Sequence, residues 1–366
     1  MKWKSIILTL LTLIVVQPLS AWTYNPAVGR YVGNNSCNQG NCQTGCNPCQ
    51  TNFNCCLPCV DFTLYGDWLY WKVRRCELDY VFPCSGVLVA EGKSHSTNPC
   101  YDSGFRVGAR AQICNWDFGA RYTYYHTDDE ARIIDPDGNI QPSRLHPAGN
   151  AQIGKNELKF ADSTYDFDYD VVDIEFGRTI DTCYCDHLRF FGGVKLAYID
   201  QKLFSCYSAD PEYKKGQPTT AESAAIWEKT NVDAYGLYAG GEGHWNLCGC
   251  FGAFGRIGGG ALYGDFNRSV LEKRTDDDTV IVNTKDCCAK LITNFEIGAG
   301  LEFVFNTCFC GDWGIQVGYE FHHWGNMLDF IQFSGNDDTA EYPATTDRHS
   351  EDIGLDGVFV RLSASF

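Results

Sequence analysis

The strongest constraint on the fold of this chain is a period-two alternation of apolar with polar or glycine residues, repeated in long stretches. In residues 291–305, mostly apolar side chains occupy every second position, and Glu296 and Glu302 lie between them. Successive side chains of a strand point to opposite faces, so each such stretch predicts a strand with one apolar and one polar face.

Ten stretches of this kind, each of about 10–13 residues, are long enough to cross a bilayer at a tilt. They cover residues 62–73, 104–113, 116–125, 165–176, 188–198, 235–245, 251–263, 291–305, 313–324 and 357–366. In residues 165–176 the alternation slips at Val171 and Val172, which predicts a β-bulge.

The connections between these stretches alternate in length. The short ones contain Cys114, Cys183/Cys185, Cys248/Cys250 and Cys308/Cys310. The long polar ones cover roughly residues 75–101, 126–162, 200–230, 265–289 and 325–352. Short turns on one rim and long loops on the other are typical of outer-membrane barrels. Soluble sandwiches usually have strands of only about 5–6 residues. We therefore predict an all-β fold, a transmembrane antiparallel β-barrel of about ten strands; the pattern leaves open counts up to sixteen.

The pattern of the N-terminal residues predicts an export signal. Two lysines precede an apolar run from Ile6 to Val16, and small residues follow up to Ala21. We predict a signal peptide at 1–21, a Cys-rich periplasmic head at 22–60 and an outer-membrane barrel at 61–366. The formal net charge of −17 argues against a nucleic-acid partner.

Export permits disulfides, and the chain has 20 cysteines. The two residues of a Cys-x-Cys pair close too small a ring to bond each other without strain, so each has a partner elsewhere. We predict disulfides that join the head to the short turns or to neighbouring envelope proteins. The cysteines concerned are Cys37, Cys42, Cys46, Cys49, Cys55, Cys56, Cys59, Cys114, Cys183, Cys185, Cys248, Cys250, Cys308 and Cys310. Zinc binding or redox activity of the two Cys-x-x-Cys pairs in the head is a weaker alternative, because only six residues separate the pairs.

Charged residues gather on the polar faces of the predicted strands. On a lipid-facing surface Arg or Lys would cost roughly 2–4 kcal/mol each at mid-depth, so we expect these residues to line an aqueous lumen. They are Asp67, Arg106, Arg110, Asp117, Arg121, Arg189, Lys195, Glu242, Arg256, Glu296, Glu302, Glu320 and Arg361. The basic residues on the early strands would form a wall facing an acidic wall of Glu296, Glu302 and Glu320. The same residues could instead plug the barrel with salt bridges, since about eight strands enclose an interior that side chains just fill.

Two features carry a family resemblance. The chain ends on an alternating strand with Phe366, which resembles the C-terminal assembly signal of bacterial outer-membrane barrels. The sequence GDWLYWK at 66–72, after a Cys-rich head, resembles the first strand of the Legionella-type major outer membrane protein family, which has members in chlamydia-related bacteria. The resemblance implies a β-barrel porin that assembles as a trimer, with cysteines that cross-link the envelope.

No motif indicates catalysis. His322 and His323 are adjacent, so on a strand they point to opposite faces and cannot act together. The sequence DPDGN at 135–139 lacks the Glu of a calcium loop, because position 146 is His146, and it predicts a plain turn. We expect no enzymatic activity, no cofactor and no dedicated metal site; loose calcium binding by acidic loops such as 275–279 stays open.

Three functions fit these features. The first is a porin for passive diffusion of small hydrophilic solutes and ions, cross-linked into the envelope by disulfides to other Cys-rich proteins. The second is a structural protein with a plugged barrel, and the third is an adhesin that acts through the long loops. In all three cases we expect the barrel to be surrounded by outer-membrane lipid. A homotrimer is one possible assembly.

Overall fold

The computed structural model divides the chain into two units, Met1–Cys59 and Val60–Phe366, and the residues that it describes all belong to the second. They are residues 60–83, 93–146, 158–180, 182, 187–213, 221–248, 250–307, 311–334 and 345–366.

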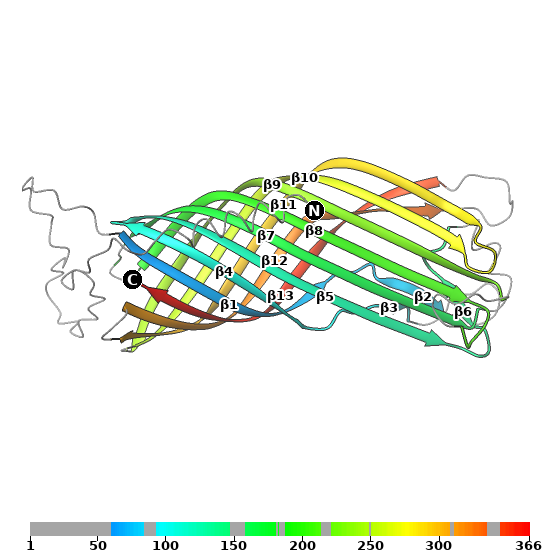
Figure 1. Ribbon diagram of the computed structural model, residues 1–366, viewed down its shortest axis with the longest axis horizontal. Helices are drawn as coiled ribbons and strands as arrows, with labels where there is room; N and C mark the ends of the chain where they lie inside the picture. Colours follow the sequence, from blue (N-terminus) through cyan, green and yellow to red (C-terminus); the bar gives the residue numbers. More distant parts are fainter. Residues whose placement is uncertain are drawn as a thin grey trace, which may run out of the picture. The chain divides into compact units, whose positions relative to one another are not determined.

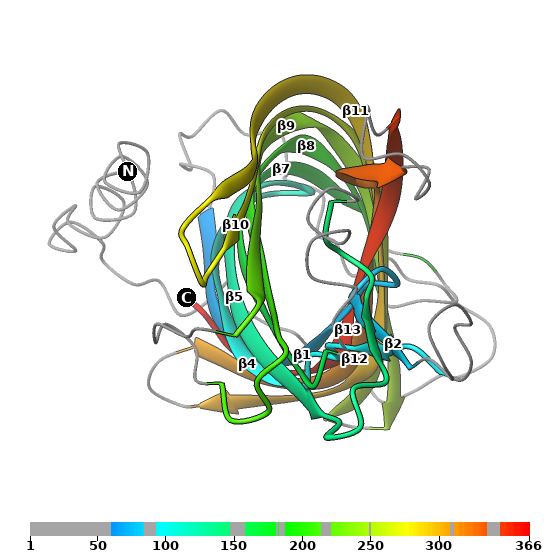
Figure 2. The same ribbon diagram turned by 90° about the vertical axis from the view of Figure 1, so that its right-hand side faces the viewer.

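Ten strands of this unit form a closed antiparallel barrel (Figures 1 and 2), which confirms the predicted fold class. In barrel order they are β1 (Val60–Arg74), β13 (Thr345–Ser365), β12 (Gly311–Ser334), β11 (Val280–Thr307), β10 (Phe251–Arg274), β9 (Ser223–Cys248), β8 (His187–Ser208), β7 (Phe160–Ile180), β5 (Trp116–Ile134) and β4 (Asp102–Ile113). The first and last strands close the ring. Phe62 and Phe366 exchange two backbone hydrogen bonds at this seam, with N···O distances of 3.1 and 2.8 Å.

The predicted division into two faces is present along the strands. On β1, Asp67 is only 4% exposed whereas the neighbouring Trp68 is 52% exposed. The exposed apolar residues form a band on the outer wall, including Phe118 of β5 and Leu301 of β11. A closed barrel satisfies every backbone hydrogen bond between strands, so such a wall can face hydrocarbon without unpaired peptide groups.

The predicted bulge in β7 is wrong. Residues 171–172 pair in regular register with both β5 and β8. The slip in the sequence pattern arises because each face of β7 changes its chemistry along the strand. The inner face passes from the aromatic Tyr169 to the acidic Asp173, and the outer face passes from the acidic Asp168 to the apolar Ile174.

The strands are also longer than predicted, from 12 residues in β4 to 28 in β11. Much of the sequence assigned to long loops is strand instead; for example, β10 and β11 continue to a turn at 275–279. A bilayer crossing takes about 9–11 residues of tilted strand. The barrel wall therefore continues beyond the membrane on the side away from the short turns. This is the extracellular side if the short turns are periplasmic.

Close approaches of rings to glycines shape the inner wall. A Cβ atom on Gly108 of β4 would lie 2.3 Å from Cζ of Tyr65 on β1, so any larger residue would force this ring to move. Phe254 of β10 lies in the same way over Gly300 and Gly318. Glycines thus let large side chains fill the lumen.

Aromatic side chains fill the lumen on the long-loop side of the charged residues predicted for the inner face. We call these residues the aromatic plug: Trp71, Tyr125, Tyr165, Phe167, Tyr169 and Trp324, each less than 2% exposed. The ring centroids of Trp71 lie 5.8 Å from Tyr125 and 6.2 Å from Tyr169, and Tyr169 lies 6.0 Å from Trp324. Rings at these separations gain packing energy beyond simple burial.

A small sheet lies at the long-loop end of the barrel (Figure 1). It contains β2 (Asp79–Pro83), β3 (His95–Ser96) and β6 (Ile140–Pro142), in the order β3-β2-β6. An apolar cluster that includes Val81 and Ile140 packs it against Tyr207 and Ile226 of the barrel wall. We call this sheet, with residues 143–146, the cap.

Candidate functional site

All thirteen charged residues that the sequence predicts on the polar face lie on the inner side of the barrel. Nine are buried. The other four, Arg110, Arg256, Glu302 and Arg361, keep 13–24% of their side chains exposed. Whether any of them lines a conducting pore stays a prediction, because what the structure gives directly is their position and their partners.

The predicted basic and acidic walls are in direct contact across the lumen. Arg106 of β4 donates to Glu320 of β12, with an Nη2···Oε1 distance of 2.7 Å. Arg121 of β5 donates to Glu296 of β11 at 3.2 Å, and Lys195 of β8 donates to the other oxygen of Glu296. These strands are not neighbours in the barrel, so the pairs cross its interior rather than follow its wall.

A second group of ion pairs joins β5, β7, β8, β9 and β10. Arg189 donates to Asp117 at 2.6 Å and to Glu175 at 3.0 Å. Arg256 also donates to Glu175, and its Nη1 lies 3.3 Å from Oε2 of Glu242. The two arginines therefore share the Glu175 carboxylate, and neither pair can be removed without affecting the other.

Four members of this network were not predicted from the sequence. Asp173 bridges Arg121 and Lys195, and Glu175 is described above; both were hidden by the apparent slip in β7. His244 lies 2.9 Å from both Glu242 and Glu302, and His322 lies 3.5–3.6 Å from Glu320 and Glu296. The alternation alone would have placed His244 inside, since it is two residues after Glu242 on the same strand.

We call these residues together the ionic layer. It contains seven basic side chains, eight acidic side chains and two histidines. They are Arg106, Arg110, Arg121, Arg189, Lys195, Arg256 and Arg361; Asp67, Asp117, Asp173, Glu175, Glu242, Glu296, Glu302 and Glu320; and His244 and His322. Basic and acidic groups are thus nearly balanced, as expected for charges that compensate each other in a site with little water.

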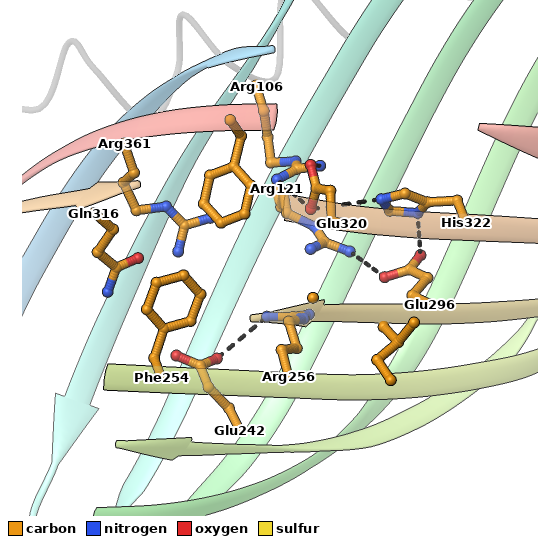
Figure 3. Close-up of a pocket in the computed structure, with 13 residues that line it drawn as sticks. Arg106, Arg121, Glu242, Phe254, Arg256, Glu296, Gln316, Glu320, His322 and Arg361 are labelled. Carbon is orange, nitrogen blue, oxygen red and sulfur yellow. Dashed lines mark hydrogen bonds and ion pairs between the residues drawn. The ribbon is translucent and has the colours of Figure 1, made fainter. Parts of the chain in front are cut away.

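Little free space remains within the ionic layer. Figure 3 shows its central cavity, where Arg106, Arg121, Glu296, Glu320 and His322 point toward one another. The cavity has a volume of about 20 Å³, which holds about one water molecule.

The ionic layer is joined directly to the aromatic plug. The Lys195 ammonium lies 4.4 Å from the ring centroid of Tyr238 and 5.8 Å from that of Trp324. The Arg106 guanidinium lies 5.4 Å from the Trp71 ring, which in turn lies 4.8 Å from the ring of His322. Cations over aromatic faces are attracted by the ring quadrupole, so the two layers stabilise each other.

Three of the predicted disulfide cysteines lie in the described residues. Cys114, Cys248 and Cys250 are exposed at the short-turn rim, and none of them forms a disulfide with another described cysteine. Cys114 has a positive φ of 57° in the tight turn between β4 and β5. The head cysteines and Cys183, Cys185, Cys308 and Cys310 lie outside the described residues, so the predicted linkages stay untested. Phe366 ends the chain next to β13 and is 60% exposed, and its role as an assembly signal is likewise a prediction.

The histidine and calcium expectations can be compared with the structure. His322 is buried in the lumen, whereas 40% of the His323 side chain is exposed beside Asp352, so the two point apart as predicted. Residues 135–139 form a turn in which the Gly138 amide donates to the backbone oxygen of Asp135 at 3.0 Å.

One described group combines metal-ligand residue types: His126, Asp166 and Asp168 on the outer wall. Lys202 already donates to Asp166 at 2.8 Å, so this carboxylate has a cationic partner within the protein.

The closed barrel, its apolar outer band and its charged interior define the class: a transmembrane β-barrel of the bacterial outer membrane. The chain belongs to the family described as Legionella pneumophila major outer membrane protein precursor, which matches residues 57–366. This confirms the Legionella-type resemblance and the location in the bacterial outer membrane. Among the described residues, no helix is long and apolar enough to cross a membrane.

Similarity to solved structures is weak. The outer membrane protease OmpT from Escherichia coli has 8% identity and a TM-score of 0.37, over 84% of this chain and 96% of that chain. The Pseudomonas putida toluene transporter TodX has 10% identity and a TM-score of 0.29, over 84% and 90%. A major outer membrane protein from Thermus thermophilus has 9% identity and a TM-score of 0.25, over 84% and 100%. These likenesses carry no argument about function. No match was found among curated proteins.

Proposed function

We propose that this protein serves the outer membrane as a closed structural barrel, linked to the rest of the envelope through the cysteines on its periplasmic side. The observation that carries the proposal is the filled lumen. The central cavity of the ionic layer has a volume of only about 20 Å³, and the Arg106 guanidinium beside it lies over the Trp71 ring of the aromatic plug. Within the described residues, two layers of buried side chains thus lie across the interior that a hydrated solute would have to cross.

The chemistry of the ionic layer supports a closed rather than a transiently blocked lumen. Lys195 is 0% exposed and holds Asp173 and Glu296 together. Removing one partner from such a buried network typically costs about 3–5 kcal/mol, because the remaining charge is left without compensation.

The link to the envelope rests on the exposed thiols of Cys114, Cys248 and Cys250 at the short-turn rim. In a barrel already closed by backbone hydrogen bonds, bridges between turns would add little stability. A bridge to the Cys-rich head or to another protein would instead fix the barrel within the envelope. We therefore assign these thiols to linkage.

The second candidate is the diffusion porin for small hydrophilic solutes. Two observations favour it: the charged residues on the inner wall, and the partly exposed polar side chains near the short-turn rim, such as Thr63, Gln112 and Gln316. Conduction would then require a rearrangement that separates the basic and acidic walls.

Solute flux into liposomes distinguishes the two candidates. Purified, folded protein is reconstituted, and the swelling of the liposomes is followed after addition of small sugars and amino acids. The closed barrel predicts a swelling rate equal to that of protein-free liposomes, with a known porin as the positive control. A rate that rises with the amount of reconstituted protein and falls with solute size would establish the porin.

A further inference from the structure

Glu272 is a fully buried carboxyl group in the extracellular part of the barrel. It lies on the inner face of β10, beyond the lipid-facing band, and is 0% exposed. Its Oε2 accepts a hydrogen bond of 2.8 Å from the backbone amide of His146, which belongs to the cap. Among the described residues, none makes a hydrogen bond to its Oε1. This buried carboxyl group is thus one of several contacts between the cap and the barrel wall, beside the apolar cluster around Val81 and the ion pair of Arg144 with Glu228.

The surroundings of Glu272 do not favour a negative charge. Its direct neighbours on the adjacent strands are Ile226 of β9 and Val282 of β11, both apolar. Glu228 of β9 is an acidic group close enough to repel a second carboxylate. An ionised carboxylate with one oxygen unpaired in such a site is costly, so the closed arrangement favours the protonated form.

The basic groups nearby are engaged elsewhere. From the cap, Arg144 donates to Glu228 at 3.1 Å and to the backbone oxygen of Asp79 at 3.0 Å. On β10 itself, Arg268 donates to Asp286 of β11 at 2.7 Å.

Arg274, also on β10, donates to Asp276 in the following turn. The His146 side chain has a pKa below its ordinary value because of burial, so it is neutral at neutral pH. Neither residue supplies a positive charge to Glu272.

We propose that Glu272 is a proton-controlled latch that holds the cap in the mouth of the barrel, so that the cap loosens when Glu272 loses its proton. The latch differs from the closure of the lumen at the membrane level, and it would act in either of the proposed functions. The ligand it responds to is the proton alone.

The direction of the pH response follows from the two states of the carboxyl group. Burial raises the pKa of Glu272 from 4.5 to about 7 when the cap is closed; the hydrogen bond from the His146 amide lowers it by less, and repulsion by Glu228 raises it further. With the cap open, the group is solvated and its pKa returns toward the ordinary value. The closed state therefore binds more protons. Its extra stability is complete below about pH 4.5 and is lost as the pH rises through about 7.

A pair of carboxyl groups, Glu351 and Glu77, lies in the same region, and its response to pH must be distinguished from that of Glu272. Glu351 of β13 has a pKa raised to about 7 by burial and by a hydrogen bond with Glu77, which precedes β2. Its protonation would act in the same pH range, but the hydrogen bond that the His146 amide donates goes to Glu272 and not to Glu351.

Hydrogen exchange of the His146 amide tests the latch on the full-length, folded protein. Exchange is measured from pH 5 to pH 8 and expressed relative to an unstructured peptide of the same sequence, which removes the intrinsic effect of pH. For the wild type, we expect the protection of this amide to fall on the order of 50-fold across this range. Glu272→Gln stays neutral, so its protection should change little with pH, whereas Glu351→Gln should keep most of the wild-type response.

Amides in the middle of β10, around Leu262, report whether each variant is folded. If protection of His146 in the wild type does not depend on pH, the latch is refuted. It is also refuted if Glu272→Gln responds to pH as the wild type does, or if Glu351→Gln alone abolishes the response. Glu130→Gln, at an exposed position of β5, is the matched control and should behave as the wild type.

Discussion

Lys195 and Glu296 form an ion pair across the interior of the barrel, from β8 to β11, although β9 and β10 lie between these strands in the wall. Asp173 is the second partner of Lys195, at 2.8 Å. A wide, water-filled lumen would keep opposite walls apart. The direct contact between charged side chains of opposite walls is the main support for the proposal that the barrel is closed.

Replacement of Lys195 by Met should destabilise the folded barrel strongly. The change removes one of the two cations that Asp173 and Glu296 share and leaves only Arg121 between them, so a buried negative charge loses its compensation and we expect a loss of about 3–5 kcal/mol in the free energy of unfolding. Denaturant unfolding of the barrel in lipid vesicles measures it. The matched control is Lys202→Met, because Lys202 pairs with Asp166 on the exposed outer wall and should contribute only about 0–1 kcal/mol. Equal effects of the two changes would contradict the buried network.

Substitution of Gly108 by Ala tests how tightly the inner wall is filled. The new Cβ would meet the Tyr65 ring, so we expect a destabilisation of about 1–3 kcal/mol from overpacking. Gly66→Ala on β1 is the control, since a Cβ there meets no atom within 4 Å. Combining Gly108→Ala with Tyr65→Ala should restore part of the loss. If Gly108→Ala is neutral in the same unfolding assay, the close approach of ring and glycine does not exist in solution.

The two ends of the barrel should differ in thiol labelling. Cys76 and Cys100 are exposed near the long-loop end, whereas Cys114, Cys248 and Cys250 are exposed at the short-turn rim. After mild reduction of intact cells, a large membrane-impermeant maleimide should label the first two and spare the other three, as read by peptide mass spectrometry. Permeabilised cells should show labelling of all five. Labelling of the short-turn cysteines on intact cells would invert the topology.

Deletion of residues 37–59 tests the proposed link to the envelope. Non-reducing electrophoresis of envelopes should show high-mass species that collapse to the monomer when reductant is added. The deletion removes the seven head cysteines and should abolish these species while the barrel remains folded. High-mass species that persist unchanged would show that the head is not the linker.

The sequence predicted the barrel because alternation of side chains depends only on local strand geometry. It also placed residues such as Asp67 and Arg106 on the inner face, because a charge on the lipid side is costly. It failed where the surroundings change along one strand. In β7 the inner face is aromatic at Tyr169 and acidic at Glu175, and a pattern that assumes one chemistry per face reads this change as a bulge.

The extent of contact within the lumen could not be predicted from the sequence either. Whether opposite walls touch depends on how far each side chain reaches and on the glycines that admit the rings, such as Gly108 beside Tyr65. Alternation gives the face of a residue but not the distance to its partner. The sequence therefore left the open and the plugged barrel as alternatives, and the contacts of Lys195 and Arg106 favour the plugged one.

Conductance of the wild-type protein in a planar lipid bilayer tests the closed barrel most directly. Folded protein is inserted at neutral pH in symmetric salt, and insertion is verified by recovery of the protein from the membrane. A closed barrel predicts a current equal to that of the protein-free bilayer, with no stepwise increases as protein is added. Reproducible steps of uniform size, scaling with the salt concentration, would show an open aqueous path through the ionic layer and would contradict it.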